Sequence, residues 1–140
     1  MATRSAIGYK TVTGEVNAIY CHWDGYLEHN GKILAENYTT EAKVRELIAL
    51  GDLSGLGETI GSKTDFNNAA EGQCVAYGRD RGETDVAATT FEDTDEFVTR
   101  MSEQNCELFY LWNGNEWIVS NGTLQFDRVE DLILHPMFNL

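Results

Sequence analysis

Residues 16–23 read Val-Asn-Ala-Ile-Tyr-Cys-His-Trp, and their side chains alternate with the period of two that is typical of a β-strand. Just before them, Ile7 and Tyr9 alternate in the same way, and Thr13-Gly14 supplies a turn between the two runs. We therefore predict a β-hairpin near the start of the chain. Its second strand ends at Asp24-Gly25, a pair that favours a turn.

Helical spacing follows the predicted hairpin. Residues 27–38 carry apolar and small side chains on one face, and residues 41–50 do so again between a cap at Thr39 or Thr40 and a stop at Gly51. Residues 51–72 are rich in glycine and have no sustained period, which predicts a long projecting loop. Residues 73–78 alternate once more and predict a short strand.

The second half of the chain holds equally local signals. Asp93-Thr-Asp-Glu96 resembles a capping box and predicts a helix through Met101. Residues 107–112 and 116–120 predict two strands joined by a turn at Asn113-Gly-Asn115, with Phe109 and Leu111 on one face and Tyr110 and Trp112 on the other. A last short helix is expected to open at Asp127 and to stop before Pro136.

The order of these elements is β-β-α-α-β-α-β-β-α. Hairpins at both ends of this order predict an α+β fold with a mostly antiparallel sheet and helices packed on one face. A length of 140 residues with 42% hydrophobic residues predicts one globular domain over residues 1–140, and no repeat or linker interrupts it.

The charge is strongly negative and unevenly placed. The formal net charge is −13, and the segment from residue 80 to residue 107 holds nine carboxylates against Arg81 and Arg100. Such a field repels nucleic acid and anionic lipid, and it attracts basic protein surfaces over roughly 8–10 Å at physiological salt.

We expect no direct nucleic-acid binding. The simpler alternative is a solvated acidic surface that keeps the protein dissolved. The candidate binding carboxylates are Asp80, Glu83, Asp85, Glu92, Asp93, Asp95 and Glu96.

The three cysteines, Cys21, Cys74 and Cys106, are odd in number and widely spaced, which favours reduced thiols in a cytosol over a disulfide framework. The first residues lack the apolar run of a signal peptide, and no stretch has the length of a membrane span. These features predict a protein that works inside a cell and away from membranes.

The segment from residue 19 to residue 26 is the densest in reactive side chains, and its candidate binding residues are Tyr20, His22, Trp23, Asp24 and Tyr26. His22 and Asp24 are two positions apart and share a face of an extended strand, so an imidazole–carboxylate pair for acid–base work is one hypothesis. The alternative is that His22 bonds locally and that Asp24 forms the turn. No nucleophile is fixed beside them, and we assign no catalytic residue.

Arg79 and Arg81 flank Asp80 directly after the predicted strand. Arginine forks suit phosphate or carboxylate groups, so the pair is a candidate anion site; an internal ion-pair cluster with Asp80 and Glu83 is the equal alternative. Cysteine and histidine are scattered singly, without the spacing of a zinc site, and the acidic segment lacks a calcium-loop pattern. We expect neither a metal nor a cofactor.

Several stretches resemble a family of small proteins from tailed-phage genomes. They are Arg4-Ser-Ala-Ile7, Ala18-Ile-Tyr-Cys-His-Trp-Asp-Gly-Tyr26, Leu34-Ala-Glu-Asn-Tyr38, Leu50-Gly-Asp-Leu-Ser54 and Val75-Ala-Tyr-Gly-Arg-Asp-Arg-Gly-Glu83, together with the aromatic hairpin near 109–117. The resemblance implies a phage-encoded accessory protein in the cytoplasm of a bacterial host. Small acidic proteins in that setting often inhibit host defence or transcription, as anti-CRISPR proteins and DNA mimics do, and this step is an analogy.

Three functional hypotheses follow. The first is a non-enzymatic acidic inhibitor, in which carboxylates of residues 80–107 and 116–131 replace phosphates in the basic groove of a host nucleic-acid-handling protein. The second is a nucleotide-like ligand stacked on the Tyr20–Tyr26 segment and held by Arg79 and Arg81. The third is a virion or scaffolding component. A homo-oligomer is compatible with all three.

Overall fold

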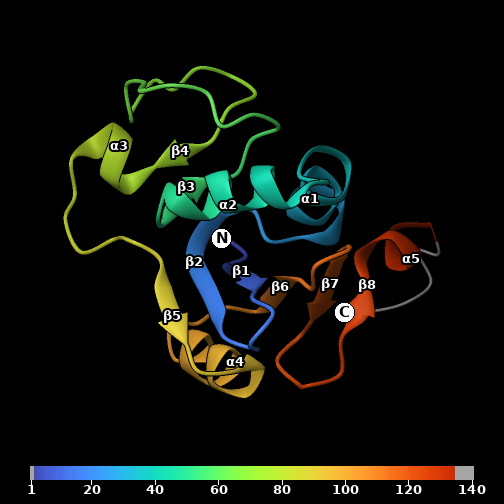
Figure 1. Ribbon diagram of the computed structural model, residues 1–140. Coiled ribbons are helices and arrows are strands. Elements are labelled where there is room, and N and C mark those ends of the chain that lie inside the picture. Colours follow the sequence, from blue (N-terminus) through green and yellow to red (C-terminus); the bar gives the residue numbers. More distant parts are fainter. Residues whose placement is uncertain (1, 135–140) are drawn as a thin grey trace.

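A mixed sheet runs through the middle of the computed structural model, which describes residues 2–134 (Figure 1). Within these residues eight strands pair in the order β4-β3-β2-β1-β6-β7-β8, and β5 pairs with β2. The strands are β1 (Ser5–Lys10), β2 (Val16–Trp23), β3 (Leu53–Gly55), β4 (Val75–Ala76), β5 (Thr89–Phe91), β6 (Leu108–Trp112), β7 (Trp117–Ser120) and β8 (Asp127–Arg128).

The predicted N-terminal hairpin is confirmed and occupies the centre of the sheet. β1 and β2 are antiparallel, with Ser5 opposite Cys21 and Lys10 opposite Val16. On its other side β1 pairs in parallel with β6, and β2 pairs in parallel with β3. The remaining strand pairs are antiparallel, so the sheet is mixed but mostly antiparallel, as predicted.

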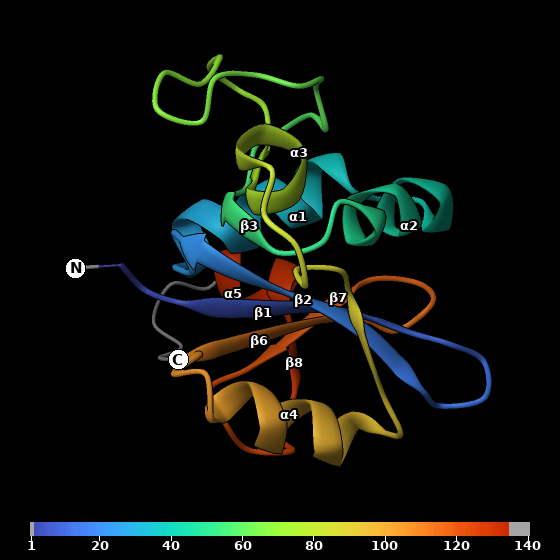
Figure 2. The same ribbon diagram turned by 90° about the vertical axis from the view of Figure 1, so that its left-hand side faces the viewer.

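Both faces of the central strands are buried. Ile7, Ile19 and Tyr110 point into one apolar cluster, beneath α1 (Lys32–Asn37), α2 (Glu41–Ala49) and α5 (Val129–Leu134). Phe109 and Leu111 point into a second cluster on the opposite face, beneath α4 (Thr94–Ser102). Figure 2 shows α4 as the one helix of residues 2–134 on its side of the sheet.

The α+β class is therefore confirmed, but the expectation that the helices pack on one face is wrong. All five residues of β6 are buried, in the order Leu-Phe-Tyr-Leu-Trp. Side chains on both faces of this strand are apolar, so both faces must pack against other elements. α4 packs on the second face.

The two early helices follow the prediction closely. The first begins with a π-helical segment, Leu27–Gly31, and continues as α1. α2 is capped by Thr40, whose hydroxyl oxygen accepts a hydrogen bond from the Lys43 backbone N–H at 3.3 Å. The chain leaves this helix through Gly51 at φ +78°, a left-handed conformation that glycine adopts without strain.

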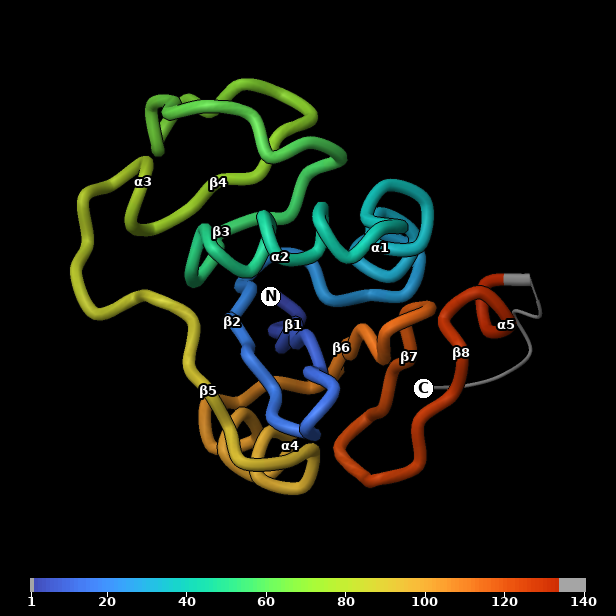
Figure 3. Tube along the Cα trace, viewed as in Figure 1, coloured from blue at the N-terminus to red at the C-terminus, as the bar shows by residue number. Residues whose placement is uncertain are grey.

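The predicted strand over residues 73–78 is only partly correct. β4 comprises two residues, and a short helix, α3 (Tyr77–Arg81), follows it at once and ends at Gly82, where φ is +74°. The carboxylate of Asp80 accepts a hydrogen bond from the Ala76 backbone N–H at 2.8 Å, which satisfies a donor at the start of this helix. The long loop predicted before β4 contains β3 and then projects above α2 (Figures 2 and 3).

The C-terminal elements also resemble the prediction. Asp93 Oδ1 accepts the Glu96 backbone N–H at 2.8 Å, as predicted for the N-cap of α4. Glu96 Oε1 accepts the Glu92 backbone N–H at 2.7 Å, one residue before the N-cap, so the start of α4 resembles a capping box without forming its exact reciprocal bond. The hairpin of β6 and β7 is confirmed, whereas β5 was not predicted. Asp127 and Arg128 form β8, and α5 begins only at Val129. The stop before Pro136 lies outside the described residues.

Phe97→Ala should destabilise the fold strongly, because Phe97 is fully buried and its ring packs edge-on against Phe109 at 6.1 Å between centroids. We expect a loss of about 3–5 kcal/mol in the free energy of unfolding, measured by urea denaturation. Thr99→Ala, on the exposed side of the same helix, should change it by less than about 0.5 kcal/mol. Equal effects of the two changes would contradict the placement of α4 over the second face.

Candidate protein-binding surface

The segment from residue 19 to residue 26 divides between the core and the surface. Cys21 is completely buried, and burial raises the pKa of its thiol to about 12, so Cys21 stays protonated and is no nucleophile at neutral pH. The Tyr20 hydroxyl and His22 Nδ1 lie 2.8 Å apart. Trp23 and Tyr26 are about half exposed, at 46% and 49%.

The proposed pair of His22 and Asp24 does not form, which corrects that hypothesis. β2 ends at Trp23, so Asp24 no longer follows the strand, and its Oδ1 accepts a hydrogen bond from the Thr3 backbone N–H at 3.1 Å. His22 instead contacts Tyr20. Of the alternative, the local bond of His22 is confirmed, whereas the Asp24 carboxylate bonds to Thr3, far earlier in the chain, and not within a turn of its own.

Arg79 and Asp80 form an internal ion pair that anchors the long loop. Arg79 Nε donates to Asp80 Oδ1 at 3.0 Å, and its two Nη atoms donate to the carbonyl oxygens of Ile60 and Cys74, each at 2.8 Å. Asp80 also accepts the Thr64 backbone N–H at 3.0 Å. Burial alone would raise the pKa of Asp80, but these hydrogen bonds outweigh it and hold the pKa below its usual value.

Of the two alternatives for this segment, the geometry therefore matches the internal cluster. The Arg79 guanidinium has no pair of N–H groups free to bind a phosphate. The Asp80 carboxylate is too deeply buried to contact a partner protein. Arg81 lies over the rings of Phe66 and Tyr77, 4.4 and 5.0 Å from their centroids, and pairs with Glu83. Asp85 is exposed on the loop that follows.

The carboxylates that remain available gather at the start of α4. Residues 89–107 contain six carboxylates and one cation, Arg100, whose ion-pair partner is Glu103 at 3.8 Å. Among residues 2–134, no lysine or arginine nitrogen lies within 4.0 Å of the four carboxylates in residues 92–96. Asp93 and Glu96 also cap the helix, whereas Glu92 and Asp95 are exposed at its start.

An open groove of about 700 Å³, lined by both apolar and polar residues, lies beside these carboxylates. Its apolar lining comes from the buried Leu111, which belongs to the cluster beneath α4, and from Ile118 and Phe126, which are partly buried against that cluster. Leu124 stands at this groove and is 58% exposed. Asp93 and Asp95 line the groove on the α4 side, and Lys10 contributes a single positive charge. We call Glu92, Asp93, Asp95, Glu96 and this groove the α4 surface.

Sequence reasoning identified the acidic part of the α4 surface and missed its apolar part. The alternation of β6 indicated that Leu111 shares a face with Phe109, but Leu124 and Phe126 lie in a segment without periodicity. Their meeting with Leu111 depends on the pairing of β6, β7 and β8.

The second acidic stretch, residues 116–131, is partly neutralised by one cation. Arg128 forms ion pairs with Glu116, Glu130 and Asp131, with nitrogen–oxygen distances of 2.5, 3.6 and 3.2 Å. Three carboxylates share one guanidinium, so the cluster keeps a net negative charge. This stretch is therefore a weaker candidate than the α4 surface for meeting a basic partner.

No three His, Cys, Asp or Glu side chains within residues 2–134 are placed to hold a metal ion. The helices in that range are all too short or too polar to cross a membrane.

Comparison of the chain with protein-family models, with curated proteins and with solved structures finds no match. Its function is therefore inferred from its own residues and geometry.

Asp80→Asn should remove the buried charge that pairs with the largely buried side chain of Arg79, at a cost of about 3 kcal/mol in the free energy of unfolding. The Asp80 pKa is lower in the folded than in the unfolded chain, so its stabilising effect is present above about pH 4 and is lost as the pH falls through the folded-state value. Urea unfolding between neutral and acidic pH should thus show a shallower acid dependence in the variant than in the wild type.

Glu83→Gln is the matched control, since it breaks a neighbouring but exposed ion pair and should cost less than about 1 kcal/mol. An Asp80→Asn protein that kept the wild-type stability and acid dependence would contradict the anchoring role.

Proposed function

We propose that this chain is a phage-encoded acidic binding protein that occupies the basic groove of a host nucleic-acid-handling or defence protein. The observation that supports this proposal best is the α4 surface, where carboxylates without an ion-pair partner in the described residues stand beside a partly apolar groove. The resemblance of several stretches to tailed-phage proteins supports the viral source.

The charge density of the α4 surface is of the order that a nucleic-acid groove recognises. Residues 92–96 carry four carboxylates over roughly 8–10 Å of chain, part of it extended and part helical. Duplex DNA places about five or six phosphate charges along the same length. A Lys/Arg groove that fits DNA would therefore meet a comparable negative potential here.

The partly apolar groove gives the surface a feature that phosphates lack. Interfaces take most of their affinity from a few buried apolar or aromatic contacts, and surrounding charges mainly set the association rate and the specificity. The exposed Leu124 and the groove floor at Phe126 are suited to the first role, and Glu92 and Asp95 to the second.

The nucleotide-binding alternative has weaker support. It requires Arg79 and Arg81 to bind a phosphate. The guanidinium of Arg79, however, already donates hydrogen bonds to Asp80 and to two backbone carbonyl groups. Arg81 stacks on aromatic rings and pairs with Glu83. No specific observation favours a virion component.

The test compares two variants with the same change in charge. The α4 variant combines Glu92→Gln, Asp95→Asn and Glu103→Gln and leaves the capping residues Asp93 and Glu96 intact. The control variant combines Glu36→Gln, Glu41→Gln and Glu46→Gln on the opposite side of the sheet. Each protein is immobilised, exposed to bacterial lysate at low salt and eluted with a salt gradient, and the eluted proteins are identified by mass spectrometry.

We expect at least one nucleic-acid-binding protein to bind the wild type and the control and to be lost from the α4 variant. Its Kd for the wild type should rise steeply with salt, by about tenfold or more between roughly 50 and 200 mM, and DNA or RNA should compete for it. Affinity that is independent of salt, or equal loss from both variants, would count against the proposal.

A further inference from the structure

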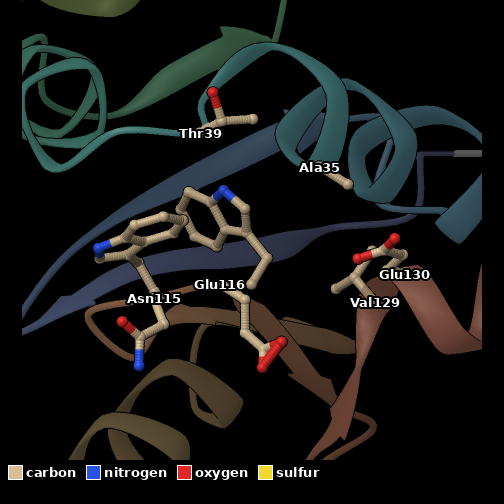
Figure 4. A pocket seen from close by; sticks show the side chains of 8 residues that line it. Ala35, Thr39, Asn115, Glu116, Val129 and Glu130 are labelled. Carbon is tan, nitrogen blue, oxygen red and sulfur yellow. The ribbon is translucent and has the colours of Figure 1, made fainter.

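A second, smaller pocket lies on the other face of the sheet, away from α4. It has a volume of about 150 Å³ and is formed where α1, the turn between β6 and β7, and α5 meet. Figure 4 shows Ala35 and Thr39 on one side, Asn115 and Glu116 on the hairpin, and Val129 and Glu130 across from them. Trp112 and Trp117 complete the wall, with their ring centroids 5.6 Å apart.

The two tryptophans offer this pocket ring carbon and no hydrogen-bond donor. The Nε1–H of Trp117 donates to the Tyr38 carbonyl oxygen at 2.8 Å. The Nε1 atom of Trp112 is closed to solvent and has no hydrogen-bond partner among the described residues. Both side chains are almost completely buried, so a ligand in the pocket meets aromatic carbon only at the small part of each ring that remains exposed.

The charged groups that line the pocket are both carboxylates, Glu116 and Glu130, with side-chain exposures of 34% and 68%. Arg128 pairs with both from outside the lining and with Asp131 as well. The two lining carboxylates and Asp131 share this one guanidinium, which leaves an excess of negative charge beside the pocket.

Aromatic carbon combined with carboxylates is the chemistry that recognises organic cations, through cation–π attraction and charge. We propose that the pocket bounded by Trp112, Trp117, Glu116 and Glu130 binds a small alkylammonium group. A dry cavity of about 150 Å³ holds a molecule the size of benzene. The space therefore accepts a trimethylammonium head or the end of a lysine side chain, and it is too small for a nucleotide.

The first test uses three probes that separate charge from shape. Tetramethylammonium chloride carries the charge, tert-butanol has nearly the same size and shape without it, and n-propylammonium chloride represents a lysine end. Each is titrated into the full-length protein at constant ionic strength, with sodium chloride replaced in equal amounts. The readout is the shift of the tryptophan indole N–H resonances in a ¹H–¹⁵N spectrum.

We expect saturable shifts of the Trp112 and Trp117 resonances with a Kd on the order of millimolar for at least one ammonium probe. Trp23, which lies outside the pocket, should not shift, and tert-butanol should bind at least about tenfold more weakly. The relative affinity of the two ammonium probes distinguishes a free quaternary amine from a lysine side chain as the source of the group.

Three substitutions test the geometry. Ala35→Leu should fill the pocket and abolish binding. Glu130→Gln should weaken binding about two- to fivefold, whereas Arg128→Gln should strengthen it by a similar factor, since it removes the cation that competes for the same carboxylates. Glu28→Gln, an exposed carboxylate outside the pocket lining, is the charge control and should leave the Kd unchanged.

The opposite response to Glu130→Gln and Arg128→Gln cannot come from loss of fold alone, and thermal unfolding of each variant checks that it is folded. Equal shifts from tert-butanol and the ammonium probes, binding that survives Ala35→Leu, or no saturable shift from any ammonium probe would overturn the proposal.

Discussion

The central strands β1, β2 and β6 have to be buried on both faces, and the rest of the structure depends on this constraint. Tyr110 and Ile7 on one face and Phe109 and Leu111 on the other are almost completely removed from water. Burial on this scale is the main favourable term in folding, at about 25 cal/mol for each Å² of apolar surface. Helices from both halves of the chain are therefore needed, three on one face and α4 on the other.

This constraint also explains why the acidic groups of α4 lie where they do. A helix that alone covers one face must begin at a defined residue, and Asp93 and Glu96 fix its start by capping. Negative charge in the first turn is stabilised by the helix dipole, so Asp95 and Glu96 can stay without a cationic partner among residues 2–134 at little cost to the fold. The same residues thus serve the helix and leave a negative surface beside the groove.

Much of the fold could be predicted from the sequence because its signals are local. The hairpin of β1 and β2, the cap of α2 at Thr40 and the cap of α4 at Asp93 each depend on residues that are close in the chain. α3 could not be predicted, because its conformation is tied to contacts of Arg79 and Asp80 with Ile60 and Thr64, which are 19 and 16 residues away.

The same distinction applies to the two candidate sites. The carboxylates of the α4 surface are visible in the composition, but the groove beside them joins Leu111, Ile118 and Phe126 through strand pairing. The tryptophan pocket likewise joins α1 and α5 across the β6–β7 hairpin, and no spacing in the sequence indicates that Ala35 and Val129 meet. Local sequence patterns indicate helices and strands. A cavity forms only where elements that are distant in the sequence pack together, so these patterns do not predict it.

The outermost strands of the sheet have a further consequence. β4 and β8 contain two residues each, and β5, beside β2, contains three. A long exposed edge would let another polypeptide add a strand through backbone hydrogen bonds with little regard to its sequence. Edges this brief offer almost no such template. In the described residues, selection of a partner therefore falls mainly to side-chain shape and charge, and strand addition by another copy of the chain is disfavoured.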